Sequence, residues 1–411
     1  MNLKTLKNTN VDGKTILYRS PYDIGVKEVN GKLVVKDDSR IKATIPTLKY
    51  LIKKKCKIVI LTWVKRPDGK VVEELRTTPH AEKLRELLGK PVQKANDCIG
   101  GEVHEKIASL KPGEILMLEN TRFHPEEMVD NDEFAQELAK NGELIVHDAF
   151  PQAHRIHAST TGILRHLPAC AGLYLQSEVE ALTKLVENPP KPFVVIIGGA
   201  KISDKVDAIN NLLTLADEIL IGGGVANVFL KAKGFDMGGS FMEDVFVDKV
   251  KKEKKDWVVY AKEILEKDKK GKIKLPQDLV LGNSLENAKE VKTVGIGKSK
   301  ALVGKGWAAL DIGPKTSKDY KKIISGAKCV FWNGPMGLFE DERFSKGSEI
   351  VAKAMIGVKG TKVVSGGDTI EAARKFTDLN SYTHVSLAGG ATLEFLAGKK
   401  LPALEPLYTN S

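Results

Sequence analysis

Four glycine-rich turns in the second half of the chain have the composition of phosphate-binding sites. Glycine lets the backbone approach an anion closely, and a helix that follows the turn points its free N–H groups at the anion. One such turn alone is typical of a tight turn without a ligand, but four at successive predicted strand ends favour a phosphate site. The four are Gly198-Gly199-Ala200-Lys201, Gly222-Gly223-Gly224, Gly366-Gly367-Asp368-Thr369 and Gly389-Gly390-Ala391-Thr392.

Two lysines that follow the first glycine turn could neutralise phosphate charge. Lys201 and Lys205 are four residues apart, so on a helix that begins after the turn both ammonium groups would reach one face near its N-terminus. A P-loop is excluded because Lys292 takes the place of its first glycine, and no turn has the spacing of a dinucleotide-binding fingerprint. A nucleotide would therefore be held by another arrangement.

Five arginines in the first half of the chain have a distribution that suits an anion pocket. Arginine offers a planar, permanently charged fork that pairs with carboxylate and phosphate. Each of the five lies near the end of a predicted strand or in the turn after it, and together they are expected to face the lysines and glycines of the other half. They are Arg19, Arg40, Arg66, Arg122 and Arg155.

A metal site and a disulfide framework are both disfavoured by the sequence. His154 and His157 flank Arg155, but no carboxylate or cysteine in the local sequence completes a zinc ligand set, so we expect them to line the polar pocket. The four cysteines are scattered without a C-x-x-C pair, which predicts buried free thiols.

The elements that position these residues follow from an alternation of apolar runs with helical patterns along the whole chain, which predicts βαβ units and parallel sheets. Helical patterns cover Ile45–Lys55, Pro79–Leu88 and Ser177–Glu187. Strands in the second half are each followed by a glycine-bearing turn, where open α/β sheets bind ligands. The expected strands are Thr15–Arg19, Lys57–Trp63, Ile115–Leu118, Glu143–Val146, Pro192–Ile197, Glu218–Ile221, Asp278–Leu281, Lys328–Trp332, Thr361–Val364 and His384–Val385.

A length of 411 residues exceeds what a single core usually serves. The helix Ser177–Glu187, with Ser177 as its cap, ends at the proline-rich segment Asn188–Pro192, where we expect the link between domains. The sequence therefore predicts two doubly wound parallel-sheet (Rossmann-like) α/β domains joined by a hinge helix. Their expected bounds are 1–174 and 175–395, with 396–411 packing back near the first.

Composition narrows the class of partner. The net charge of +11 comes largely from lysines interleaved with acids, and no nucleic-acid-binding signature accompanies it, so nucleic acid is not an expected partner. A site for polyanionic small molecules explains part of the excess. No apolar run reaches membrane-spanning length and no secretory signal is visible, which predicts a cytoplasmic protein without a membrane partner.

Several long stretches resemble the phosphoglycerate kinase family, over nearly the whole chain. In the first half these are Leu118-Glu119-Asn120-Thr121-Arg122-Phe123-His124-Pro125-Glu126-Glu127, Asp148-Ala149-Phe150 and Ala153-His154-Arg155. In the second half they are Lys191-Pro192-Phe193 through Gly198-Gly199-Ala200-Lys201, Asp311-Ile312-Gly313-Pro314, Trp332-Asn333-Gly334-Pro335-Met336-Gly337, Gly366-Gly367-Asp368-Thr369 and Leu393-Glu394-Phe395.

The resemblance implies an ATP-dependent kinase that transfers a phosphoryl group directly and reversibly between ATP and the carboxylate of 3-phosphoglycerate. It implies an N-terminal acid-substrate domain and a C-terminal nucleotide domain, with Mg²⁺ as the partner of ATP or ADP and a monomer as the default state. Asp368 would bind the metal and Glu340 the ribose.

The resemblance also implies a set of site residues. The implied catalytic residues are Arg40, Lys201, Lys205, Gly389 and Gly390. The implied nucleotide-binding residues are Gly199, Lys205, Gly223, Gly224, Asn333, Glu340, Gly366, Gly367, Asp368 and Thr369. The implied acid-binding residues are Asp23, Arg40, Trp63, Arg66, Arg122, His154 and Arg155.

Departures from the family pattern cluster in the acid-substrate half. Pro21 and Asp23 stand where the family has Asp and Asn, and Trp63 stands where it has a phosphate-facing His. Two alternatives stay open beside 3-phosphoglycerate. One is a different carboxylic acid, such as a larger one that stacks on Trp63. The other is a non-catalytic regulator that binds nucleotide or nucleic acid, against which the retained Lys201, Lys205 and Asp368 count.

Overall fold

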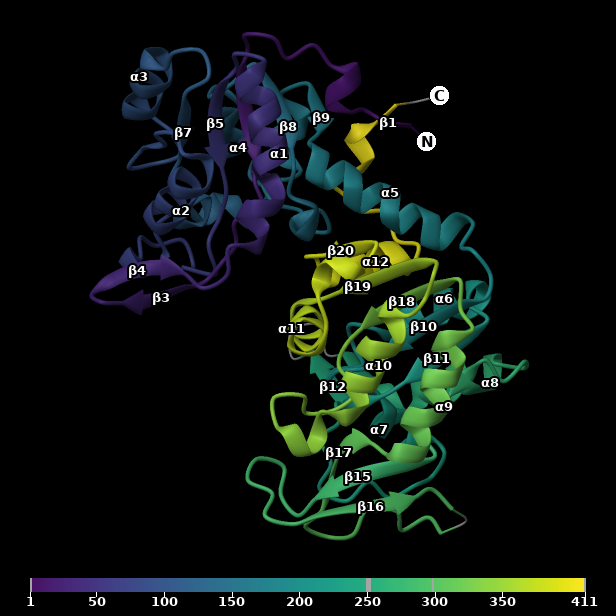
Figure 1. Cartoon of the computed structure of the whole chain (residues 1–411). Helices are drawn as coiled ribbons and strands as arrows, with labels where there is room; N and C mark the ends of the chain where they lie inside the picture. The colour runs from purple at the N-terminus through teal and green to yellow at the C-terminus, as the bar shows by residue number, and fades with distance from the viewer. Residues whose placement is uncertain (1, 249–252, 298, 410–411) are drawn as a thin grey trace. The chain divides into compact units, whose positions relative to one another are not determined.

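The structure is a computed structural model that describes residues 2–248, 253–297 and 299–409 (Figure 1). The chain divides into two compact units, each considered by itself. The first unit contains the described residues of Met1–Ala181 and Lys400–Ser411, and the second contains those of Leu182–Lys399. The chain passes from the first unit to the second within helix α5 (Leu173–Glu187).

The first unit is built on a six-stranded parallel sheet with the order β6-β7-β5-β2-β8-β9. Its strands are β2 (Thr15–Arg19), β5 (Lys57–Leu61), β6 (Gln93–Lys94), β7 (Ile115–Met117), β8 (Leu144–His147) and β9 (Ala169–Ala171). Arg19, the last residue of β2, pairs with Leu61 on one side and His147 on the other. The segments that follow these strands therefore meet at one edge of the sheet.

Helices cover both faces of this sheet, because successive side chains of a strand point to opposite faces. Ile58 and Ile60 of β5 pack in the core that contains residues of α1 (Ser39–Lys53) and α2 (Thr78–Leu88). Val59 and Leu61 pack in the core that contains residues of α3 (Gly101–Ser109) and α4 (Asp132–Ala139). This is the doubly wound arrangement.

The second unit has its own six-stranded parallel sheet, with the order β14-β11-β10-β18-β19-β20. One face is covered by α9 (Pro314–Ser325), α10 (Lys346–Ile356) and α11 (Gly367–Phe376), whose apolar residues share a core with Ile196, Trp332 and Val364. The strands are β10 (Phe193–Ile197), β11 (Glu218–Ile221), β14 (Ile273–Lys274), β18 (Cys329–Asn333), β19 (Thr361–Ser365) and β20 (His384–Ser386). The helices are α6 (Val206–Leu215), α7 (Gly223–Ala232), α8 (Trp257–Lys267), α9 (Pro314–Ser325), α10 (Lys346–Ile356), α11 (Gly367–Phe376) and α12 (Gly390–Leu396).

Smaller sheets complete the two units. Two short strands near the chain ends, β1 (Asn2–Leu3) and β21 (Tyr408–Thr409), pair within the first unit. The other small elements are β3 (Val26–Val29), β4 (Lys32–Val35), β12 (Val245–Asp248), β13 (Glu253–Asp256), β15 (Asp278–Gly282), β16 (Val291–Gly295) and β17 (Ala308–Ile312).

The predicted fold class of two doubly wound α/β units is confirmed, but two details of the elements are wrong. Asp278–Leu281 is a strand, yet it belongs to the antiparallel sheet β16-β15-β17. Ser177 does not cap α5, which begins at Leu173, because its hydroxyl donates to the Tyr174 carbonyl inside the helix at 2.8 Å. The two compact units meet in the sequence at 181/182 and 399/400, and the bounds 174 and 395 of the functional domains stay a prediction.

In the described part of the chain, no helix combines the length and the apolar character needed to cross a membrane.

Candidate functional site

In the second unit, glycines let the strand-end turns pack backbone against backbone. A Cβ added to Gly198 would lie 2.2 Å from the Pro335 carbonyl oxygen, and one added to Gly223 would lie 2.8 Å from the Gly199 nitrogen. Gly199 and Gly223 also have left-handed φ angles of 83° and 59°, which favour glycine. The turns after β10, β11 and β18 therefore form one continuous surface of packed backbone, which we call the glycine wall. Within it, Gly224 packs against Ala200.

Two other predicted glycines have no such packing role. A Cβ added to Gly367 or Gly389 would meet nothing within 4 Å. Gly367 begins α11, and Gly389 directly precedes α12, whose first residue is the exposed Gly390. Open space at the N-terminus of a helix leaves its free N–H groups accessible to an anion.

Lys205 lies beside the glycine wall. Its Nζ is 3.6 Å from where a Cβ on Gly199 would lie, and it donates to the Lys201 carbonyl at 3.2 Å. Burial lowers the pKa of Lys205, while the carboxylates of Asp204 and Asp368 act in the opposite direction. A partly desolvated ammonium beside a glycine-rich turn is suited to bind a phosphate.

The predicted start of the following helix at Lys201 is wrong. Residues 203–205 form a turn, and α6 begins at Val206 with Lys205 at its N-cap position. The two lysines are therefore not placed by helical spacing. Lys205 is held by its hydrogen bond to the Lys201 carbonyl, whereas the Lys201 side chain is exposed.

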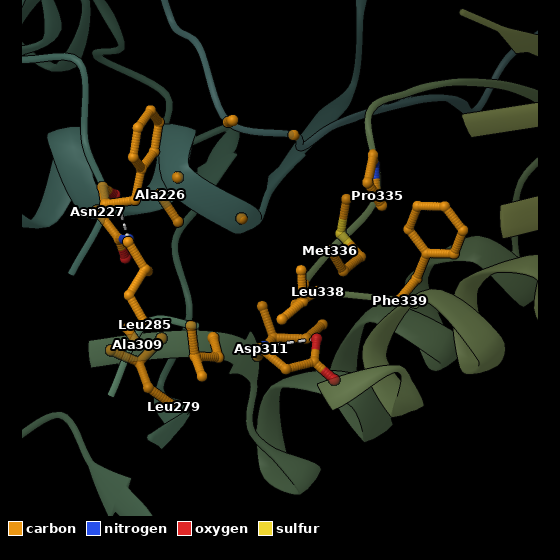
Figure 2. A pocket seen from close by; sticks show the side chains of 18 of the residues that line it. Ala226, Asn227, Leu279, Leu285, Ala309, Asp311, Pro335, Met336, Leu338 and Phe339 are labelled. Atoms are coloured by element: carbon orange, nitrogen blue, oxygen red, sulfur yellow. Dashed lines mark hydrogen bonds between the residues drawn. The ribbon is translucent and has the colours of Figure 1, made fainter. Parts of the chain in front are cut away.

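A cavity of about 530 Å³ adjoins the glycine wall (Figure 2). Five of the predicted nucleotide-binding residues line it, namely Gly199, Gly223, Gly224, Glu340 and Asp368. Figure 2 shows Ala226 and Asn227 on one side of the cavity and Met336 and Phe339 on the other. A cavity of this size, apolar over much of its lining and with a few polar groups, is typical of a small-molecule site.

Most of the apolar lining was missed by sequence reasoning. Phe241, Leu279, Leu285 and Leu338 line the cavity, but in the sequence such residues cannot be told from ordinary core positions. Asp311 also lines it and is nearly buried, which raises the pKa of its carboxyl to about 7. Its oxygens accept from the backbone N–H groups of Ile312 and Gly347 at 2.9 and 2.8 Å, so it joins β17 to α10.

Three of the predicted nucleotide-binding residues shape the turns themselves. Asn333 is buried and its Nδ2 donates to the Ser365 carbonyl at 2.9 Å. Thr369 is buried and its hydroxyl accepts from the Gly334 N–H at 2.7 Å. Gly366 has a φ of 93°, and a Cβ there would lie 3.0 Å from Asn333 Nδ2. These residues link the ends of β18 and β19.

In the first unit, the five predicted arginines gather at the carboxyl edge of the sheet. Arg19 ends β2, Arg66 follows β5, and Arg122 follows β7. Arg155 follows β8, and its charge, like that of Arg66, acts on the Arg122 guanidinium. Arg40 lies in the first turn of α1 and donates to the Asp23 carbonyl at 2.9 Å.

Trp63 is part of this cluster, and two guanidinium groups lie against its indole ring. The Arg19 and Arg122 Cζ atoms lie 4.3 and 4.2 Å from its ring centroid, and only 1% of the residue is exposed. The expectation that Trp63 offers a stacking face to the substrate is therefore wrong, because cations cover the ring and it is buried. The contacts are cation–π interactions that partly balance two buried charges.

Asp23 is the counter-charge on one side of the cluster. Its Oδ2 accepts from the Trp63 Nε1–H at 3.2 Å, and its Oδ1 accepts from the Lys65 N–H at 2.8 Å. Burial lowers the pKa of Arg122, although Asp23 opposes this shift. Arg122 donates to the Lys65 carbonyl at 2.6 Å and lies 3.0 Å from His157 Nε2.

Glu127 is a second counter-charge, and sequence reasoning missed it. It is fully buried, and its carboxylate accepts from the N–H and the hydroxyl of Ser159 at 3.0 and 2.5 Å. Burial raises its pKa, while the charges of Arg19 and Arg122 favour the ionised form. The signal for it was weak, because Glu126-Glu127 in the sequence is indistinguishable from an exposed acidic pair.

The predicted His154 lies among these positive charges. Burial, together with the nearby Arg155, lowers its pKa to about 4, so the ring is neutral at neutral pH. Asp97, Cys98 and His124 form a separate group with metal-ligand chemistry. Asp97 Oδ1 already accepts from the Cys98 N–H and lies 2.7 Å from His124 Nε2, so hydrogen bonds account for this group.

Comparisons with known proteins agree with this geometry. The family model for phosphoglycerate kinase matches residues 6–399. The chain is 44% identical over 405 residues to the phosphoglycerate kinase of Moorella thermoacetica, with 98% of each chain covered. It is similar to the solved structure of phosphoglycerate kinase from Coxiella burnetii, with a TM-score of 0.81, 35% identity and 99% of each chain covered. The corresponding structure from Pyrococcus horikoshii OT3 gives a TM-score of 0.82, 33% identity and 98% of each chain covered. The chain therefore belongs to the phosphoglycerate kinase family.

Proposed function

We propose that this protein catalyses reversible phosphoryl transfer between ATP and the carboxylate of 3-phosphoglycerate, giving ADP and an acyl phosphate. The observation that carries the proposal is the glycine wall with Lys205 beside it, which adjoins a 530 Å³ cavity lined by Glu340 and Asp368. Membership of the phosphoglycerate kinase family supports the same reaction.

The second unit would hold the nucleotide. The apolar part of the cavity suits a purine base, and the exposed Glu340 carboxylate at its border suits the ribose hydroxyls. The phosphates would lie along Gly199, Gly223 and Gly367, because Lys205 lies beside Gly199 and helices α7 and α11 begin at Gly223 and Gly367 with N-termini that suit anions.

The exposed carboxylate of Asp368 fits a magnesium ion that travels with the nucleotide. It is a hard oxygen ligand at the start of α11, on the lining of the cavity, and its charge acts on the Lys205 ammonium. Mg²⁺ is commonly bound by one or two carboxylates together with substrate phosphates. When bound, the ion would supply positive charge to the phosphate oxygens.

The first unit would hold the acid. Arg40, Arg66, Arg122 and Arg155 supply forked donors for a phosphate and a carboxylate. His154 is neutral beside Arg155 and can serve as a hydrogen-bond partner. In the transfer, a carboxylate oxygen of the acid forms a bond to the γ-phosphorus of ATP as the bond from that phosphorus to its bridging oxygen breaks. Positioning and charge neutralisation by Lys201 and Lys205 suffice for this step, so no nucleophilic side chain is needed.

A coupled assay of ATP consumption with 3-phosphoglycerate and Mg²⁺ tests the proposal. We expect rapid turnover by the wild type and a loss of about 100-fold or more in kcat for Lys205→Ala, because an ammonium aimed at the transferring phosphate is removed. Lys399→Ala is the control, since this lysine pairs with Asp207 on the surface. Absence of turnover in the wild type would contradict the proposal, and nucleotide binding without turnover would direct the search to another carboxylic acid.

A further inference from the structure

We infer that Trp63 and Asp23 form a coupled positioning pair that fixes the guanidinium of Arg122 for the acid substrate. The inference rests on the proposed function, in that the acid is taken to bind at the arginine cluster. In this inference the two residues do not contact the substrate. They act on it by positioning Arg122.

The indole of Trp63 supports two buried, like charges. Arg19 Nη2 and Arg122 Nε are buried and have no hydrogen-bond partner among the described residues. Both guanidinium groups lie against the indole ring, at 4.3 and 4.2 Å from its centroid. The negative π face offsets the missing acceptors, in addition to the counter-charges of Asp23 and Glu127. A side chain without an aromatic face at position 63 would remove this contact.

The pairing of Trp63 with Asp23 is chemically specific. The indole nitrogen and the Lys65 backbone nitrogen can only donate hydrogen bonds. Each points at a different oxygen of the Asp23 carboxylate. Asparagine at position 23 would place its NH₂ group against one of these donors. Tryptophan at position 63 therefore requires a carboxylate at position 23, and the two positions are expected to change together.

The pair also joins the segments that carry the acid-binding arginines. The Asp23 carbonyl accepts from Arg40, and the Asp23 side chain holds Lys65. The Lys65 carbonyl in turn accepts from Arg122. Loss of the Trp63–Asp23 hydrogen bond would loosen the segment after β5 and, with it, the position of Arg122.

A double-mutant cycle of Asp23→Asn and Trp63→His tests the pair. A neutral imidazole can offer a nitrogen acceptor to the asparagine NH₂, while the asparagine oxygen accepts from the Lys65 N–H. We expect each single variant to raise KM for 3-phosphoglycerate by about tenfold or more. Asp23→Asn places an NH₂ group against a donor, and Trp63→His removes the indole face from the two guanidinium groups. The double variant should raise KM by less than the product of the two single effects, because the imidazole can accept from the asparagine NH₂ but cannot replace the indole face. KM for ATP should stay within about twofold of the wild type in all three, since the pair lies in the first unit.

Two further measurements keep the test decisive. Trp63→Phe keeps an aromatic face but loses the donor, so it should raise KM for the acid less than Trp63→Ala does. Urea unfolding of the four proteins of the cycle reports the same coupling without turnover. If the single effects simply add, both in KM and in unfolding, the pair is not coupled and the inference is wrong. If the wild type turns over no acid but unfolding shows coupling, the pair stands and the proposed function fails.

Discussion

At the scale of single residues, burial keeps three histidines of the first unit neutral. The pKa falls to about 4 for His80 and His154 and to about 3 for His147, in each case mainly through burial. At a pH between these lowered pKa values and the ordinary histidine pKa of 6.5, the folded chain binds fewer protons than the unfolded chain. The free energy of unfolding therefore falls as the pH is lowered through this window and is fully retained above it.

His80→Gln is expected to weaken this acid sensitivity. His80 Nε2 lies 2.9 Å from the Ile24 carbonyl, and a glutamine amide can donate to the same oxygen. Between pH 7 and pH 4.5 the wild type should lose on the order of 2 kcal/mol more than the variant, as measured by urea unfolding at each pH. Equal losses in the two proteins would show that His80 is not protonated on unfolding.

Gly367→Val tests whether open space at a helix N-terminus is kept for a ligand. Because a Cβ at Gly367 meets nothing within 4 Å, the variant should unfold within about 0.5 kcal/mol of the wild type. Its KM for ATP should nevertheless rise about tenfold or more, because the side chain would occupy the space proposed for phosphate. Gly101→Val is the matched control, since Gly101 begins α3 with equally open surroundings. An unchanged KM for ATP would remove Gly367 from the proposed site.

At the scale of elements, one side chain holds the segment between β5 and α2. Asn120 Nδ2 donates to the carbonyls of Val64 and Leu75, both at 2.9 Å. Its Oδ1 accepts from the N–H groups of Val64 and Arg122 at 3.0 and 3.1 Å. All the hydrogen-bonding capacity of this amide is thus used to fix both ends of a segment that carries Arg66.

Asn120→Ala should therefore loosen this segment. We expect a loss of about 2 kcal/mol in the free energy of unfolding, because buried backbone groups are left unpaired. KM for the acid should rise while KM for ATP does not change, as steady-state kinetics with each substrate varied would show. Asn96→Ala is the control, since Asn96 is exposed and bonds only to Glu102 among the described residues. Equal effects on both KM values would argue against a local role for Asn120.

The sequence predicted the strands and the glycine turns because their signals are local. An apolar run of strand length followed by glycine indicates the same structure wherever it lies, as at Phe193–Ile197 and Gly198. The burial of Trp63 could not be predicted, because it depends on Arg19, Arg122 and Asp23, which other segments of the chain supply. The apolar lining of the nucleotide cavity was missed for the same reason, since no local pattern separates Leu279 from a core residue.

At the scale of the whole molecule, the first unit is discontinuous in sequence. The last described residues return to it through the β1–β21 pairing and a hydrogen bond from the Ala403 N–H to the Ala153 carbonyl at 3.1 Å. Ala153 directly precedes His154 and Arg155. The returning segment thus supports the backbone next to two of the proposed acid-binding residues.

Hydrogen exchange measured by mass spectrometry can test whether the second unit binds the nucleotide and the first unit binds the acid. Mg-ADP should slow exchange in the second unit, in the turns around Gly199, Gly223 and Gly367, because bound nucleotide would stabilise these turns against local opening. The acid alone should slow exchange in the first unit, around Trp63 and Arg122. Lys205→Ala should weaken the first effect and leave the second unchanged. Protection of the first unit by Mg-ADP alone, with none in these turns, would contradict the assignment of the nucleotide to the second unit.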